Sequence, residues 1–239
     1  MIARILKSPV AIGRSAIGKS AVIGFFLHAC YLGGVFFAIS RGVSAGLAAV
    51  ITSLQPVLVS VVAIKVLGEK LRRIQGVGLL LGLGGVVLVL RPGFEGSIST
   101  LGICAVFIAL LGSTTATILQ KKFGSEIPLL VGTAYQYLAS GFVLGLLAIT
   151  MGETHIQWNI KFVGAMIWLI LALSVGAILL LLWLLNTGSA TSVSSLFYLV
   201  PPATALEAYF LFGEKVSTPG LIGIVIAALG VWLVIKPSS

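Results

Sequence analysis

Hydrophobic residues fall into eight long runs that are separated by short polar connections. Each run is close to the 20 or so residues that an α-helix needs to cross a hydrocarbon core roughly 30 Å thick. A β-barrel is the poorer fit, because the runs are about twice as long as a barrel strand requires. The pattern predicts transmembrane helices over 21–40, 45–68, 74–91, 100–120, 128–151, 163–186, 190–213 and 218–235.

The composition agrees with this pattern. Of the 239 residues, 59% are hydrophobic and 9% are charged, whereas soluble domains are about 25% charged. So few charges cannot cover a soluble surface of this size, and the short connections leave no room for a soluble domain. We therefore expect an all-α polytopic membrane protein, with residues 1–20 as a cytoplasmic N-terminal arm.

The basic residues are unequally divided between the two sides of the predicted helices. Basic residues are enriched in the cytoplasmic connections of membrane proteins. The side that carries more of them would therefore be cytoplasmic, and both chain termini lie on it. It carries Arg4, Lys7, Arg14, Lys19, Lys65, Lys70, Arg72, Arg73, Lys121, Lys122 and Lys236, against Arg41, Arg91, Lys161 and Lys215 on the other side. Charges scattered in this way do not form a nucleic-acid-binding face.

The chain repeats itself at an offset of 145 residues. This offset aligns AGLAAVITSLQPVLVSVVAIKVLGEKL with ATSVSSLFYLVPPATALEAYFLFGEKV without a gap. Pro56 meets Pro201, the Gly-Glu-Lys of 68–70 meets that of 213–215, and Pro92 meets Pro237. Matches at proline, glycine and charged positions are not explained by a general excess of apolar residues.

The offset carries the second predicted helix onto the seventh, a displacement of five helices. Because five is odd, the two copies would face opposite ways across the membrane, as in many secondary transporters. The second unit (100–237) has five helices, whereas the first (21–92) has only the equivalents of its last three. The first unit therefore lacks two N-terminal helices. Truncation, natural variation or a partner chain that supplies the two helices would each explain this.

The two copies resemble the EamA family of the drug/metabolite transporter superfamily. The motifs that carry the resemblance are LQPVLVSVVAIKVLGEKLRRIQGVGLLLGLGGVVLVLRP and LVPPATALEAYFLFGEKVSTPGLIGIVIAALGVWLVIKP. The resemblance implies a two-repeat transporter in a bacterial inner membrane that exports metabolites such as amino acids. It does not identify the substrate.

Glu207 is the one carboxylate that the pattern places well inside a predicted helix. An ionisable group at that depth is costly, so it points to proton coupling or recognition of a cation. A side chain that snorkels or stays protonated is the alternative. The repeat aligns the helical stripe of Thr204 and Glu207 with that of Gln55, and Thr52 extends it. We expect this polar stripe to border a central cavity, unless the threonine hydroxyls only bond to their own helices.

Other polar and proline residues form a second group of candidates. Pro56, Pro201 and Pro202 interrupt equivalent helices, either as hinges or as static kinks. Ser113, Thr117 and Gln136 either widen the cavity or act as interhelical contacts. For the paired Glu69 and Glu214 we expect structural roles at the helix ends.

No set of residues suggests catalysis. The sequence has no Asp, and its His and Cys residues do not have metal-ligand spacing, so we expect no enzyme activity and no cofactor. The function predicted is secondary transport of a small metabolite across the lipid bilayer, with a homodimer or a helper chain left open. The alternative is a membrane protein that does not transport, either an assembly partner or an inactive fragment.

Overall fold

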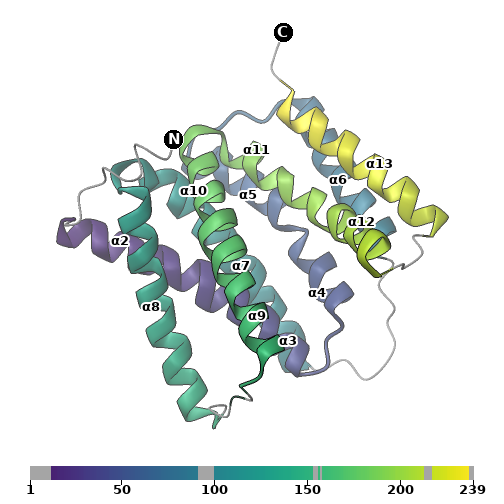
Figure 1. The fold of residues 1–239 in the computed structure, drawn as a ribbon. Helices are drawn as coiled ribbons and strands as arrows, with labels where there is room; N and C mark the ends of the chain where they lie inside the picture. Colours follow the sequence, from purple (N-terminus) through teal and green to yellow (C-terminus); the bar gives the residue numbers. More distant parts are fainter. Residues whose placement is uncertain (1–11, 91–99, 153–155, 157, 213–216, 237–239) are drawn as a thin grey trace.

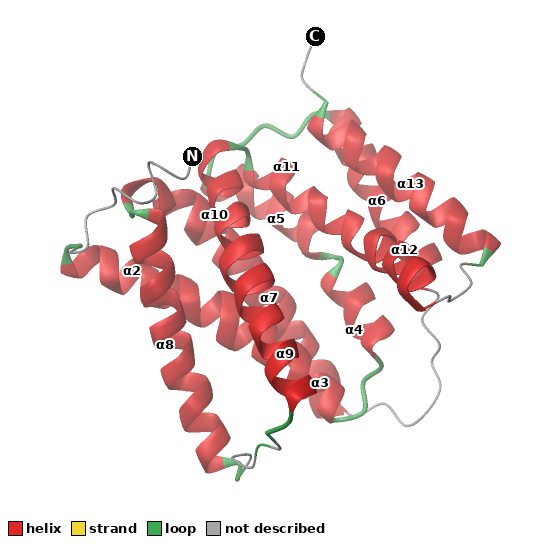
Figure 2. Ribbon diagram, viewed as in Figure 1, coloured by secondary structure: helices red, strands yellow, loops and turns green. Residues whose placement is uncertain are grey.

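The computed structural model describes residues 12–90, 100–152, 156, 158–212 and 217–236. Every element in these residues is helical (Figure 2). In chain order the elements are α2 (Arg14–Gly24), η1 (Phe25–Gly33), α3 (Gly34–Ser40), α4 (Ala45–Thr52), α5 (Gln55–Val66), α6 (Arg73–Leu90), α7 (Thr100–Phe123), η2 (Gly124–Glu126), α8 (Leu129–Thr150), α9 (Ile160–Trp168), η3 (Leu169–Ala177), α10 (Ile178–Thr187), α11 (Ala190–Ser195), η4 (Leu196–Leu199), α12 (Val200–Phe212) and α13 (Thr218–Ile235).

Seven stretches of the described helices are long and apolar enough to span a membrane, which makes the molecule an all-helical polytopic membrane protein. Each overlaps one of the helices that the hydrophobic pattern predicts. The seventh predicted helix, 190–213, is not among them; the described residues there form α11, the 3₁₀ turn η4 and α12 in succession. The seven spans are Arg14–Ser40, Ala45–Val66, Arg73–Leu90, Thr100–Glu126, Leu129–Thr150, Ile160–Thr187 and Thr218–Ile235.

The first helix in the described residues, α2, begins at Arg14, seven residues before the predicted start at 21. Lys19 does not end this helix, since its ammonium group has partners on a neighbouring element. Its Nζ lies 2.7 Å from a carboxylate oxygen of Glu126 and 4.6 Å from the ring centroid of Phe123. Pairing of this kind lets a charged residue continue a helix that the hydrophobic pattern alone would end.

The predicted helix 45–68 is broken near its middle. Ser53 and Leu54 separate α4 from α5. The Ser53 N–H still donates to the Ala49 carbonyl at 2.9 Å, but the Leu54 N–H donates to the Ile51 carbonyl, three residues earlier, at 3.1 Å. Pro56 lies in the first turn of α5, and because proline has no N–H, it cannot donate to the carbonyl of Thr52 four residues earlier. Pro56 therefore lies just after the point where α4 ends and α5 begins, and its role as a hinge or a static kink stays a prediction.

Two antiparallel helices, α6 and α13, form the most extensive helix–helix contact in the described fold, and Figure 1 shows them side by side. Glycine permits this approach. A Cβ built on Gly78 would lie 2.6 Å from the carbonyl oxygen of Gly230, and one on Gly223 would lie 2.7 Å from that of Gly85. The small-residue stripes of the two helices are thus used against each other inside the chain.

Burial is distributed unevenly over the spans. The span that contains α7 is the most buried of the seven and packs against η1, α3 and α5. The span Ile160–Thr187 is the least buried. Both this span and Arg14–Ser40 contain a nine-residue π-helical segment, η3 and η1 respectively, a feature that often accompanies functional sites.

Candidate functional site

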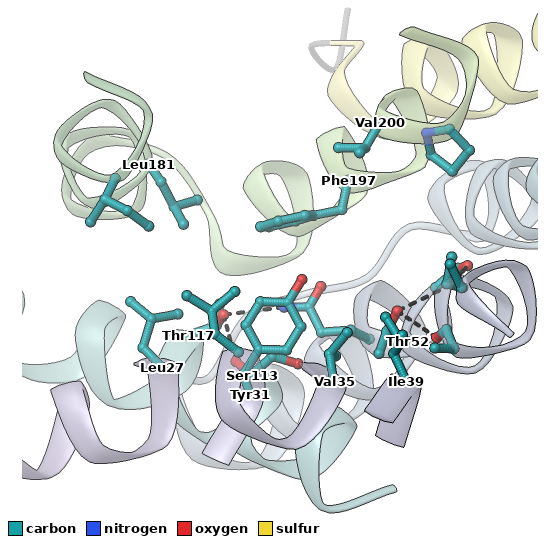
Figure 3. Close-up of a pocket in the computed structure, with 18 residues that line it drawn as sticks. Leu27, Tyr31, Val35, Ile39, Thr52, Ser113, Thr117, Leu181, Phe197 and Val200 are labelled. Carbon is teal, nitrogen blue, oxygen red and sulfur yellow. Dashed lines mark hydrogen bonds between the residues drawn. The ribbon is translucent and has the colours of Figure 1, made fainter. Parts of the chain in front are cut away.

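A cavity of about 330 Å³ lies between η1 and α3, the α4–α5 break, α7, α10, and the junction of η4 with α12. Figure 3 shows Leu181, Phe197 and Val200 on one side of it and Leu27, Tyr31 and Thr117 on the other. Its volume is at the lower end of the range for small-molecule sites. The wall is formed by Leu27, Tyr31, Leu32, Val35, Ile39, Ala45, Ala48, Ala49, Thr52, Ser53, Gln55, Ser113, Thr117, Ile178, Leu181, Phe197, Val200 and Pro201.

A chain of hydrogen bonds joins α5 to α7 at this wall. Gln55 Nε2 donates to Thr117 Oγ1 at 3.1 Å, and Thr117 Oγ1 donates to the Ser113 carbonyl at 2.9 Å. The Ser113 hydroxyl in turn donates to the Leu110 carbonyl at 3.0 Å. Gln55 is buried, and its Oε1 has no hydrogen-bond partner among the residues that the structure describes.

The hydroxyl groups on α4 and at the helix break bond to their own helix. Thr52 Oγ1 donates to the Ala48 carbonyl at 2.9 Å, and Ser53 Oγ donates to the Ala49 carbonyl at 2.6 Å. This is the bonding that the sequence leaves as the alternative for such residues. The protons of these hydroxyl groups are therefore engaged, and their remaining lone pairs can accept hydrogen bonds.

The structure brings Thr52, Gln55, Ser113 and Thr117 together, and all four border the cavity with Pro201. They come from predicted helices far apart in the sequence. Thr52 and Gln55 belong to the expected polar stripe, and Ser113 and Thr117 to the residues expected to widen the cavity. Their role in a transport pathway stays a prediction.

Other predicted site residues lie elsewhere. Glu207 is exposed on α12 and does not line the cavity. Pro56 and Pro202 are buried but do not line the cavity either. The side chain of Thr204 and all of Glu214 lie outside what the structure describes. The repeat alignment places Gln55 and Glu207 on the same helical stripe. In the structure, however, Gln55 lies on the cavity wall and Glu207 on an exposed face of α12.

Gln136 belongs to a separate buried network of amide groups. Its Nε2 donates to Gln120 Oε1 at 3.2 Å, and Gln120 Nε2 donates to Asn186 Oδ1 at 3.4 Å. Asn186 Nδ2 donates to the Gly124 carbonyl at 3.3 Å. These bonds link α8, α7 and α10, so this arrangement agrees with the interhelical alternative for Gln136.

Sequence reasoning did not single out the aromatic part of the wall, Tyr31 and Phe197. Nothing local distinguishes these residues in a chain rich in apolar positions. The repeat offset contains a signal for one of them, because 52 + 145 = 197 makes Phe197 the counterpart of Thr52. The same offset makes Val200, also on the wall, the counterpart of Gln55.

A second polar cluster lies at the end of α5. The carboxylate of Glu69 accepts hydrogen bonds from the backbone N–H groups of Ala190 at 2.6 Å and Thr191 at 3.2 Å. It also accepts one from Thr191 Oγ1 at 2.9 Å. A negative charge is favourable at the start of a helix, so Glu69 fixes the beginning of α11 against the connection between α5 and α6. This agrees with the expected structural role of Glu69.

Comparison with known proteins gives one family and several relatives. The model of the EamA-like transporter family matches residues 2–91 and 100–236. The chain is 27% identical over 191 residues to the uncharacterized transporter YvbV of Bacillus subtilis, covering 80% of this chain and 63% of the relative. It is 29% identical over 204 residues to the uncharacterized inner membrane transporter YedA of Escherichia coli K12, covering 83% of this chain and 64% of that protein. The chain thus spans less than two thirds of either relative.

A solved crystal structure has the same fold. It superposes with a TM-score of 0.76 over 94% of this chain and 79% of the solved chain, at 20% sequence identity. At that identity the likeness concerns the fold alone.

Proposed function

This chain belongs to the EamA-like transporter family, and from that premise we propose that it is a secondary transporter whose substrate binds in the cavity between α4–α5, α7 and η4–α12. The observation that carries the proposal is the position of the cavity between the repeat copies. Equivalent residues of the two copies face it, Thr52 with Phe197 and Gln55 with Val200. Transporters built from two such copies bind substrate at the interface between them.

The helix boundaries support an internal repeat. α4 and α11 begin at 45 and 190, α5 and α12 at 55 and 200, and α6 and α13 at 73 and 218. The differences are 190 − 45, 200 − 55 and 218 − 73, each of which is 145. The offset found in the sequence therefore also relates the helix starts.

The contacts between α6 and α13 support opposite orientations of the two copies. The repeat exchanges Gly78 with Gly223 and Gly85 with Gly230. When each residue is replaced by its counterpart in the other copy, the pair Gly78 and Gly230 becomes the pair Gly223 and Gly85. Both pairs are in close contact. Equivalent helices that pack antiparallel through exchanged contacts are related by a two-fold axis perpendicular to them. An axis of this kind lying in the membrane plane gives the inverted repeat.

We place both termini in the cytoplasm of a bacterium, with the chain in the inner membrane. The charge distribution supports this orientation, and YedA carries the description of an inner membrane transporter. The resemblance further suggests export of an amino acid or a related compound. Proton coupling through Glu207 stays part of this proposal, to be tested by Glu207→Gln.

A second candidate is an assembly partner that does not transport by itself. The low burial of the apolar span Ile160–Thr187 favours it, since such a face can pack against helices of another chain or of a second copy. Transport by the purified chain separates the two candidates.

The decisive test is solute uptake into proteoliposomes with the cavity filled by a larger side chain. Ala49 lines the cavity, so we expect Ala49→Phe to abolish protein-dependent uptake. Ala203→Phe is the matched control because Ala203 is exposed on α12. Equal uptake by the wild type and Ala49→Phe would contradict the proposed site, and absence of uptake by the wild type would favour the assembly partner.

A further inference from the structure

Among the residues that the structure describes, none on the cavity wall carries a charged side chain. None of the wall's 18 residues is Asp, Glu, Lys, Arg or His. A charged group moved from water into such a site loses its hydration without gaining a counter-charge, which is costly. The wall thus disfavours anions, cations and zwitterions as ligands.

The polar groups on the wall mostly offer acceptors. The hydroxyls of Thr52, Ser53, Ser113 and Thr117 all donate their protons to backbone carbonyls of their own helices. Each hydroxyl that has donated its proton can offer only lone pairs to a ligand. The phenol of Tyr31 is the exception on this wall, because a hydroxyl that can rotate is able to donate or accept.

Gln55 adds an unpaired hydrogen-bond acceptor to this wall. One N–H of its Nε2 donates to Thr117 Oγ1, whereas its Oε1 is buried and has no partner among the described residues. An unpaired buried acceptor is unfavourable, and a ligand that donates to it relieves that cost. The ligand group that would pair with Gln55 Oε1 is therefore a hydrogen-bond donor.

The rest of the wall is apolar and includes two aromatic rings, Tyr31 and Phe197, which come from η1 and η4. Rings of this kind favour a flat, apolar ligand body. We propose that the cavity binds an uncharged molecule with an aromatic or other apolar body and an N–H or O–H donor directed at Gln55 Oε1. This inference rests on the proposed transport function and narrows its substrate. It favours a neutral relative of an amino acid over the amino acid itself.

A ligand series built on one ring system tests the charge requirement. We would measure binding to the purified full chain in nanodiscs by isothermal titration calorimetry. The ligands are indole-3-acetamide (neutral), indole-3-acetate (anion), tryptamine (cation) and tryptophan (zwitterion). Indole-3-acetamide is expected to bind at least about tenfold more tightly than the other three, because only its transfer leaves no charge unpaired. Equal or tighter binding of any charged member, or no binding of the neutral one, would overturn the proposal.

A second arm tests the donor. The N-methylated analogue of indole-3-acetamide, which has no N–H on the ring or the amide, is expected to bind about tenfold more weakly than the parent. Gln55→Leu is expected to remove that difference, whereas Gln55→Glu is expected to shift the preference toward tryptamine. A preference that persists in Gln55→Leu would overturn the role of Gln55. The circular dichroism melting curve of each variant shows whether it is folded.

Failure of this inference differs from failure of the proposed function. Binding of the neutral ligand without protein-dependent flux in proteoliposomes supports the ligand class and contradicts transport. Flux of tryptophan with no binding of indole-3-acetamide supports transport and contradicts the ligand class.

Discussion

The carboxylate of Glu69 accepts a hydrogen bond from Oγ1 of Thr191 at 2.9 Å, although 122 positions separate the two residues. The same carboxylate accepts from the backbone N–H groups at the start of α11. The connection between α5 and α6 in the first repeat copy is thereby fixed to α11 of the second copy. This contact joins the two copies outside the packing of α6 against α13.

We predict that Glu69→Gln lowers the stability of the folded protein by about 1–2 kcal/mol. The substitution removes a charge from a helix start and brings an NH₂ group toward N–H donors. The measurement is the apparent Tm in detergent. Glu126→Gln is the control, because its ion pair with Lys19 is largely exposed and such pairs contribute about 0–1 kcal/mol. An equal effect of both substitutions would argue against the special position of Glu69.

Close packing of α6 on α13 gives a second prediction. A Cβ on Gly230 would lie 2.4 Å from the backbone nitrogen of Gly82, so Gly230→Ala is expected to separate the helices and cost about 1–3 kcal/mol. On the same helix pair, a Cβ on Gly84 meets nothing within 4 Å. Gly84→Ala is therefore expected to be neutral or to stabilise by about 0.5–1 kcal/mol. Opposite shifts in apparent Tm check the packing, and a loss in both variants would contradict it.

Replacement of His28 is expected to raise the stability of the protein. Its ring is buried and stacks on that of Tyr137, with centroids 4.5 Å apart. Neither ring nitrogen has a hydrogen-bond partner in the part of the chain that the structure describes. His28→Phe keeps the stacking and removes the unpaired groups, so it is expected to stabilise the protein by about 1 kcal/mol or more.

Tyr137→Phe is the matched control for His28→Phe. It retains the same stack but removes the hydroxyl that donates to the Ser174 carbonyl at 2.7 Å. A loss of about 1 kcal/mol is expected. If His28→Phe lowers the apparent Tm as well, the imidazole has a role that the described contacts do not reveal.

The membrane class and most of the spans could be predicted, because lipid imposes a minimum length of apolar chain that any sequence must display. A contact between polar residues such as Gln55 and Thr117 could also be predicted in general terms, since polar residues inside apolar helices tend to face one another. Pro56 predicted an interruption of this helix, but the position of the break at Ser53 and Leu54 was not predicted, because hydropathy does not report backbone hydrogen bonds.

Long-range partners were harder to predict. The partner of Glu69 lies beyond any local periodicity, and only the folded repeat brings it close. Glu207 illustrates a related limit. Depth along a helix can be counted from the sequence, but which face of that helix meets the cavity depends on packing that the sequence pattern does not specify.

The last prediction concerns the opposite orientation of the repeat copies. Ser44 lies in the connection before α4, and Thr187 is the last residue of α10, next to the equivalent connection before α11; both are exposed. In a chain whose Cys30 and Cys104 are replaced by alanine, we introduce Ser44→Cys or Thr187→Cys. The inverted repeat predicts that a membrane-impermeant maleimide added to intact cells labels the cysteine at 44. It predicts that the cysteine at 187 is labelled only after the cells are opened. Labelling of both from the same side would require parallel copies, and an exchanged pattern would place the termini outside the cytoplasm.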